Sequence, residues 1–101
     1  ASITVHMPYP NPSSAAFNFP FTISGQYPPK RIHLSIITVD GRNVYETTYS
    51  EDGAHVGTHT LQWDSKTNAG AYAPQGVYLY KIVIQTETEQ AVKNGKLVLI
   101  R

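Results

Sequence analysis

The sequence predicts an all-β protein that folds as a single antiparallel β-sandwich of about seven strands. No window places apolar residues at helical spacing behind a capping residue. Tyr, Phe, Val, Ile and Thr instead recur in short runs that Gly, Pro, Asn and Asp separate, which is typical of strands joined by turns. The roughly even spacing of these runs favours a sandwich. The expected strands are 3–7, 16–24, 31–39, 43–49, 58–63, 76–86 and 91–101.

The first two strands flank a proline-rich segment. Apolar and polar residues alternate over 3–7, and three prolines in PYPNPSS then end the strand. Strand 16–24 places its apolar side chains on one face, from Phe17 to Ile23. Pro20 lies within it and has no N–H to donate to a neighbouring strand. We therefore expect this strand to lie at a sheet edge or to contain a bulge.

The middle of the chain has the pattern of a hairpin. Strand 31–39 directs alternate residues, from Ile32 to Ile36, inward. Asp40–Gly41 follows and precedes strand 43–49. An Asp-Gly pair between two apolar runs is a strong hairpin signal because Gly accepts a positive φ angle without steric cost.

The last three strands are the richest in aromatic and aliphatic residues. Strand 58–63 places His59, Leu61 and Trp63 on one side, and a loop then leads to strand 76–86. That strand has apolar residues on both faces, so we expect it to be central and covered on both sides. In strand 91–101, the pair Asn94-Gly95 indicates a bulge.

Composition restricts the classes of function. The chain has 101 residues, and we expect residues 1–101 to form one domain. The absence of cysteine excludes disulfides, thiolate metal sites and cysteine nucleophiles. A net charge of +1 with 15% charged residues leaves no basic face, so we expect no nucleic-acid partner. No apolar run reaches the length of a membrane span, and the first residues lack a signal-peptide pattern. We expect either a piece of a longer precursor or a cytoplasmic chain.

The sequence offers no candidate catalytic residue, cofactor site or small-molecule site. The histidines have no partners at metal-ligand spacing, and no GxSxG or GxGxxG motif is present. Turn geometry explains the loop carboxylates more simply than catalysis does. A calcium site built on Asp64 and Asn68 matches no known calcium-loop spacing, so we expect no metal. The residues considered are His6, His33, His55, His59, Asp40, Glu51, Asp52 and Asp64.

Four segments together resemble one family. They are YPNP at 9–12, VDGRNVYE at 39–46, WDSKTNAGAYAPQGVYLYKI at 63–82 and GKLVLIR at 95–101. This pattern resembles the C-terminal sorting domain (type A) of type IX secretion cargo from Bacteroidetes. The third segment is also similar to the Ig-like domain of flagellar hook-capping proteins, and the last one tips the choice toward the sorting domain. The motif residues are Tyr9, Pro10, Asn11, Pro12, Gly41, Arg42, Trp63, Asp64, Gly70, Pro74, Gly76, Tyr78 and Tyr80.

Two positions depart from the family pattern. Ser65 follows Asp64 where the family often has Gly, and Ser13 follows Pro12 where an aromatic residue is common. Neither departure changes the assignment.

The resemblance implies an Ig-like sandwich that acts as a non-catalytic secretion signal. Such domains pass through the periplasm and are recognised by the outer-membrane translocon and its shuttle protein. A surface sortase usually removes them as the cargo is attached at the cell surface or released. Residues 1–8 are then either the remnant of a linker or the first strand, and alternation over 3–7 favours the strand.

The terminal segment is the candidate recognition element. An extended peptide offers main-chain hydrogen bonds for affinity and alternate side chains for specificity. We expect this strand to pair in the sandwich, with Lys96 and Arg101 at solvent and the terminal carboxylate accessible. The candidate residues are Gly95, Lys96, Leu97, Val98, Leu99, Ile100 and Arg101.

Two other functions remain open on the sequence. Tyr45, Tyr49 and Tyr72 would form a carbohydrate-binding platform if they shared one exposed plane, as in an accessory module of a secreted enzyme. A purely structural Ig-like accessory domain is the other alternative. An unpaired edge beside the Pro20 strand, or the terminal strand itself, would also allow a homodimer.

Overall fold

The computed structural model describes residues 2–25, 30–50, 57–87 and 89–100, which contain strands and no helix. No helix in this part of the chain is therefore long and apolar enough to cross a membrane. The strands are β1 (Ser2–Val5), β2 (Phe17–Ser24), β3 (Arg31–Thr38), β4 (Asn43–Ser50), β5 (Gly57–Trp63), β6 (Gly76–Gln85) and β7 (Gln90–Leu99).

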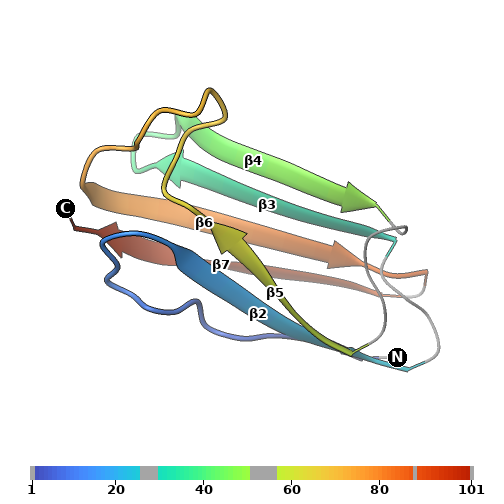
Figure 1. Ribbon diagram of the computed structural model, residues 1–101. Coiled ribbons are helices and arrows are strands. Elements are labelled where there is room, and N and C mark those ends of the chain that lie inside the picture. The colour runs from blue at the N-terminus through green and yellow to red at the C-terminus, as the bar shows by residue number, and fades with distance from the viewer. Residues whose placement is uncertain (1, 26–29, 51–56, 88, 101) are drawn as a thin grey trace.

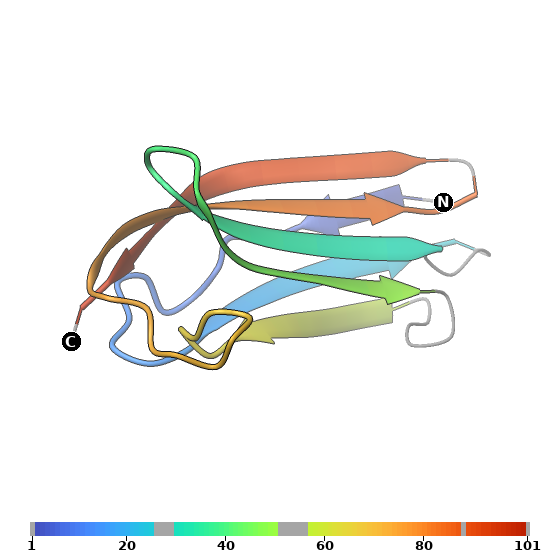
Figure 2. The ribbon, with the colours of Figure 1, turned by 90° about the horizontal axis from the view of Figure 1, so that it is seen from above.

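The strands form two antiparallel sheets that pack face to face (Figures 1 and 2). The smaller sheet has the order β1-β2-β5 and the larger has the order β4-β3-β6-β7. The expected all-β, Ig-like sandwich of seven strands is confirmed. Strand β7 lies at an edge of the larger sheet and its far end points to the C-terminus of the chain (Figure 1).

The core lies between the inward faces of the two sheets. The expected inward residues of β2 and β3 are all at most 2% exposed, which follows from the strict alternation of apolar residues in both strands. Trp63 is fully buried and packs against three other rings. Its centroid distances are 5.8 Å to Phe17, 6.4 Å to Tyr45 and 5.7 Å to Tyr78. These contacts join β2 and β5 of one sheet to β4 and β6 of the other.

The position of Pro20 differs from the sequence expectation. Strand β2 is the middle strand of its sheet, and its register with β5 runs through Pro20↔Thr60 without a bulge. The Pro20 carbonyl accepts a hydrogen bond from the His6 amide at 3.0 Å, so its backbone nitrogen also faces the β1 side. Pairing with β1 ends at Val5↔Phe21. The missing N–H therefore lies at the end of the pairing with the β1 segment, where His6 donates to Pro20 and Pro20 has no N–H to donate in return.

Strand β1 is shorter than expected, because it ends at Val5 and leaves Met7 71% exposed.

Strand β6 is central, as expected, but only its inward face is covered. On its outward face Val77 is 43% exposed and Leu79 is half-buried. The register of β6 with β7 also runs through Tyr80↔Gly95 without interruption, so the expected bulge at Asn94-Gly95 is absent.

The hairpin at Asp40-Gly41 is confirmed. Strands β3 and β4 pair on either side of it, and Gly41 has a φ angle of 93°. The Gly41 amide donates to the Thr38 carbonyl at 3.0 Å, which closes the turn.

Several turn residues named in the sequence analysis lie outside the described residues. They are Glu51, Asp52 and His55.

Candidate functional site

The terminal strand β7 exposes one set of side chains and buries the other. Leu97 and Leu99 are at most 1% exposed and belong to the core. Lys96 is exposed on the opposite face, and Ile100, just beyond the strand, is 50% exposed. The expectation that this segment pairs in the sandwich with Lys96 at solvent is met. Arg101 and the terminal carboxylate lie outside the described residues.

The free edge of β7 is covered by the YPNP segment near its end. Asn11 donates from Nδ2 to the Lys96 carbonyl at 2.8 Å and accepts from the Val98 amide at its Oδ1 at 3.0 Å. One side-chain amide thus takes the place of a peptide group in a neighbouring strand. The two residues on either side of it, Pro10 and Pro12, follow cis peptide bonds.

Ser13 continues this edge in the same direction. Its amide donates to the Val98 carbonyl at 3.0 Å, and its carbonyl accepts from the Ile100 amide at 2.9 Å. This is a short parallel bridge between Ser13 and Leu99. Residues 11–13, called here the edge segment, therefore occupy the hydrogen-bonding edge from Lys96 to Ile100.

Asn68 covers the opposite edge of the same sheet by the same means. Its Oδ1 accepts from the Glu46 amide at 2.9 Å, and its Nδ2 donates to the Glu46 carbonyl at 3.0 Å. Its own amide donates to the Val44 carbonyl at 3.3 Å. Edge strands with free backbone groups are prone to pair with other chains. Both edges of the larger sheet are thus closed at one end by asparagine side chains.

Gly95 is the first residue of the terminal motif, and the ring of Tyr80 lies close against it. A β-carbon built on Gly95 would lie 2.5 Å from Cε2 of the Tyr80 ring, nearer than such contacts normally occur. The ring is 4% exposed and meets Phe19 of the facing sheet edge-on at 5.3 Å. Burial raises the pKa of the Tyr80 hydroxyl above its ordinary value.

The loop after Trp63 explains one departure from the family pattern. Ser65 has a φ angle of 66°, a conformation that favours glycine. The serine is 1% exposed, and its hydroxyl donates to the Ala15 carbonyl. Its carbonyl accepts from the Ala73 amide at 2.8 Å. A serine is accommodated here because its hydroxyl ties the loop to the chain segment before β2.

Other motif residues fix the ends of this loop. The Trp63 indole nitrogen donates to the Lys66 carbonyl at 2.8 Å, and Asp64 accepts from the Lys66 amide at 3.2 Å. At the far end the Tyr78 hydroxyl donates to the Pro74 carbonyl. A tight turn at Gly70, with a φ angle of 89°, lies between these ends. Gly76 begins β6, which the loop leads into.

Arg42 and its neighbours form a small polar group at the β3–β4 turn. A hydrogen bond from the Thr38 hydroxyl, with the charge of Arg42 nearby, lowers the pKa of Asp40 below its ordinary value. The Arg42 Nε lies 3.4 Å from Oδ2 of Asp40. Both side chains are largely solvent-exposed, so this ion pair stabilises the turn only weakly.

The described residues contain no group of three or more histidine, cysteine or acidic side chains that could hold a metal ion. Asp64 and Asn68, considered for calcium, make the backbone hydrogen bonds given above. His33 makes a hydrogen bond of 2.7 Å to Thr48, and its other ring nitrogen lies 3.6 Å from Glu46. These contacts give Asp64, Asn68 and His33 structural partners within the larger sheet and its loop.

The tyrosines do not form the platform that a carbohydrate-binding module would need. Tyr45 is half-buried and packs on Trp63, whereas Tyr72 is 69% exposed on the loop with the Lys66 ammonium 5.1 Å from its ring centre. Tyr49 faces inward on β4 and is 39% exposed. The three rings therefore do not share one exposed plane.

Sequence reasoning found the terminal strand but missed the role of its neighbours. Asn11 and Ser13 were separate from the terminal motif in the sequence, and nothing in their spacing predicts that they cover it. Asn68 was considered as a metal ligand and not as an edge cover. The one available signal was local: an asparagine between two prolines has few backbone partners of its own.

Comparisons with known proteins agree with this architecture. The model of the family described as "Secretion system C-terminal sorting domain" matches residues 8–99. No curated protein matches the chain. A solved structure, dimeric latent PorU from Porphyromonas gingivalis, aligns with 99% of this chain at a TM-score of 0.71 and 19% identity. FlgD from Xanthomonas campestris, a protein of flagellar hook capping, aligns with 95% at a TM-score of 0.59 and 12% identity. The chain spans 10% of the first protein and 64% of the second.

Proposed function

Since the chain belongs to the secretion system C-terminal sorting domain family, we propose that residues 1–101 act as one non-catalytic domain that the type IX outer-membrane translocon and its shuttle protein recognise. The family assignment supports a secretion-signal role and a destination at the cell surface or outside the cell. We propose passage through the periplasm, followed by removal by a surface sortase. The proposal involves no cofactor, nucleic acid or small-molecule substrate.

The observation that carries this proposal is the coverage of the terminal strand by the edge segment. Four hydrogen bonds from Asn11 and Ser13 hold the stretch from Lys96 to Ile100 in one extended conformation. An extended segment held in this way loses little conformational entropy when a receptor binds it. Recognition of an ordered terminal segment is the role proposed for residues 95–101.

Burial restricts what a receptor of the folded domain can contact. Leu97 and Leu99 are in the core, and the backbone edge beside them is occupied. We propose that the receptor contacts the outward side chains of Lys96, Val98 and Ile100, together with Arg101. Pairing of a receptor strand with this same edge would first require the edge segment to leave.

The uncovered part of the β7 edge offers a place for a second copy. The edge segment bonds to β7 only from Lys96 onward, and β6 is the strand that pairs with β7 among the described residues. Backbone groups of Val92 and Asn94 lie on the edge that β6 does not occupy. Homodimerisation through this edge is part of the proposal, and light scattering at several concentrations of the isolated chain tests it.

A reporter fusion tests the proposed signal. The chain is fused behind a periplasmic reporter in a host with type IX secretion, and surface and medium fractions of the reporter are measured. Deletion of residues 96–101 should abolish export, but it also removes two core leucines. Ile100→Asp is the sharper variant because this side chain is 50% exposed. Val39→Asp is the matched control, because Val39 is 68% exposed and lies outside the proposed receptor contacts and the β7 edge.

Ile100→Asp should reduce export at least tenfold, whereas Val39→Asp should be exported like the unmodified fusion. Circular dichroism of the isolated variants verifies that both fold. Equal export of both folded variants, or export of the deletion, would place the signal outside residues 95–101.

A further inference from the structure

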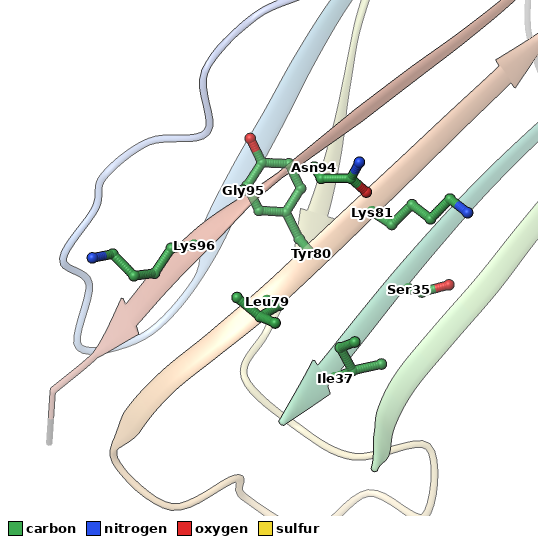
Figure 3. A pocket seen from close by; sticks show the side chains of 8 residues that line it. All are labelled: Ser35, Ile37, Leu79, Tyr80, Lys81, Asn94, Gly95 and Lys96. Carbon is green, nitrogen blue, oxygen red and sulfur yellow. The ribbon is translucent and has the colours of Figure 1, made fainter. Parts of the chain in front are cut away.

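A groove of about 610 Å³ crosses the outward face of the larger sheet, over β3, β6 and β7 (Figure 3). It lies on the face opposite the core, where the described strands add no further layer. The groove includes Gly95 and Lys96 and therefore adjoins the terminal motif. Its lining residues are Ser35, Ile37, Leu79, Tyr80, Lys81, Asn94, Gly95 and Lys96.

The strand register arranges the outward side chains of the groove in two rows. One row crosses the sheet as Ile37, Leu79 and Lys96, since Ile37 pairs with Leu79 and Leu79 pairs with Lys96. The second row is Ser35, Lys81 and Asn94. An apolar floor of half-buried aliphatic side chains thus lies beside two exposed ammonium groups placed diagonally.

The charged residues that line the groove are both lysines. None of its lining residues is acidic. Glu46 lies one strand further, opposite Ser35 on β4, and its carboxylate is 3.6 Å from a ring nitrogen of His33. Lys81 and Lys96 have no ion pair within the part of the chain that the structure describes. Two cations beside an apolar surface are complementary to a ligand that has carboxylates and an apolar group.

We infer that this groove docks an extended, acidic segment of a partner protein, which places an apolar side chain on Ile37 and Leu79 and carboxylates on Lys81 and Lys96. Diagonal residues on paired strands are about 7–8 Å apart. Alternate side chains of an extended peptide are about 7 Å apart. Carboxylates two residues apart on such a peptide therefore match the two lysines. The inference rests on the proposed sorting function and names the surface that its receptor contacts.

Titration with short peptides tests the groove directly. The ¹⁵N-labelled chain is titrated with acetyl-Leu-Thr-Asp-Thr-Asp-amide and, separately, with acetyl-Leu-Thr-Lys-Thr-Lys-amide. The acidic peptide should give saturable amide shifts confined to the groove, and the basic peptide should bind at least tenfold more weakly. The double variant Lys81→Glu/Lys96→Glu should reverse this preference. Lys30→Glu, an exposed lysine outside the groove, is the matched control and should leave the preference unchanged.

A second variant separates charge from shape. Leu79→Thr keeps both lysines and a strand-forming side chain but removes the apolar floor, so it should weaken the acidic peptide at least threefold. A preserved amide spectrum verifies the fold of each variant. Equal binding of the two peptides, shifts spread over the whole surface, or no shifts at all would overturn the inference.

Export of the reporter fusion distinguishes a failure of the groove inference from a failure of the proposed sorting function. If the intact fusion is exported and the folded Lys81→Glu/Lys96→Glu fusion is exported equally well, the sorting function stands, the groove inference is wrong and Lys96 is not a receptor contact. If the intact fusion is retained while the acidic peptide binds the groove selectively, the proposed function fails and peptide docking stands. Loss of export in the double variant alone supports both.

Discussion

The ring of Tyr80 lies against the α-carbon of Gly95, so close that a β-carbon there would come within 2.5 Å of the ring. The two residues face each other across the β6–β7 pair. They belong to the separate segments GVYLYK and GKLVLIR, and this contact joins the two. The aromatic ring fills the space that the glycine leaves and extends the core to the facing sheet.

We expect Gly95→Ala to destabilise the domain by about 1–3 kcal/mol, because the added methyl group overpacks a buried ring. The free energy of unfolding in urea measures this. The double variant Gly95→Ala/Tyr80→Leu should recover part of the loss, since leucine leaves room for the methyl group. Asn94→Ala, on the adjacent exposed position, should change stability little. Strict additivity of the Gly95 and Tyr80 substitutions would contradict the contact.

We expect Asn11→Asp to open the edge of the terminal strand. An aspartate still accepts from the Val98 amide but places a carboxylate against the Lys96 carbonyl, where the asparagine donated. The loss of a donor at this site should cost about 1–2 kcal/mol. Hydrogen exchange of the Ile100 amide, which bonds to Ser13, should accelerate about tenfold or more.

Asn68→Asp is the matched control for this experiment, because Asn68 makes the same pair of contacts on β4. It should accelerate exchange near Glu46 and leave Ile100 unchanged. Equal effects of the two variants on both edges would mean that exchange reports global unfolding and not local edge covering.

We expect Ser65→Ala to destabilise the domain more than Ser65→Gly, by about 1 kcal/mol. Both substitutions remove the hydroxyl that bonds to Ala15, but only glycine relieves the positive φ angle of 66°. Urea unfolding of the two variants gives the comparison. If alanine were the better tolerated residue, the backbone conformation at this position would not be the reason for the family's glycine.

We expect stability to fall as the pH rises above about 10. Burial raises the pKa of Tyr80, and burial with the nearby Tyr49 and Asp64 raises that of Tyr45. Above the ordinary tyrosine pKa the unfolded chain loses these protons while the folded chain keeps them, so the unfolded state gains stability. Stabilisation is complete below that pH. The free energy of unfolding should therefore fall less between about pH 8 and about pH 11 in Tyr80→Phe than in the native chain.

The faces of the strands were predictable because burial follows a period of two. Aromatic residues alternate along β2, so only one orientation of the strand buries all of its rings. The Asp40-Gly41 turn fixes the pairing of β3 with β4. The position of Pro20 was not predictable in this way. The sequence shows that proline lacks an N–H, but which neighbouring strand that N–H would face depends on the fold.

The covering of the terminal strand depends on contacts that no local pattern records. Asn11 and Val98 are 87 residues apart, and the asparagine imitates a backbone group that periodicity cannot detect. Gly95 presents the same difficulty, because a glycine in a strand indicates a bulge or a close approach and the choice depends on Tyr80. Apolar residues on both faces of β6 suggested two covering layers, whereas the sandwich supplies one and leaves the groove.

Protease accessibility of a fused reporter on intact cells shows whether the chain directs export across the outer membrane. The complete chain is placed behind a reporter that otherwise stays in the periplasm of a type IX-competent host, and protease is added outside the cells. We expect the external protease to digest the reporter, or the reporter to be found in the medium. A reporter that resists digestion until the outer membrane is disrupted, although the attached domain is folded, would show that this chain is not a sorting signal.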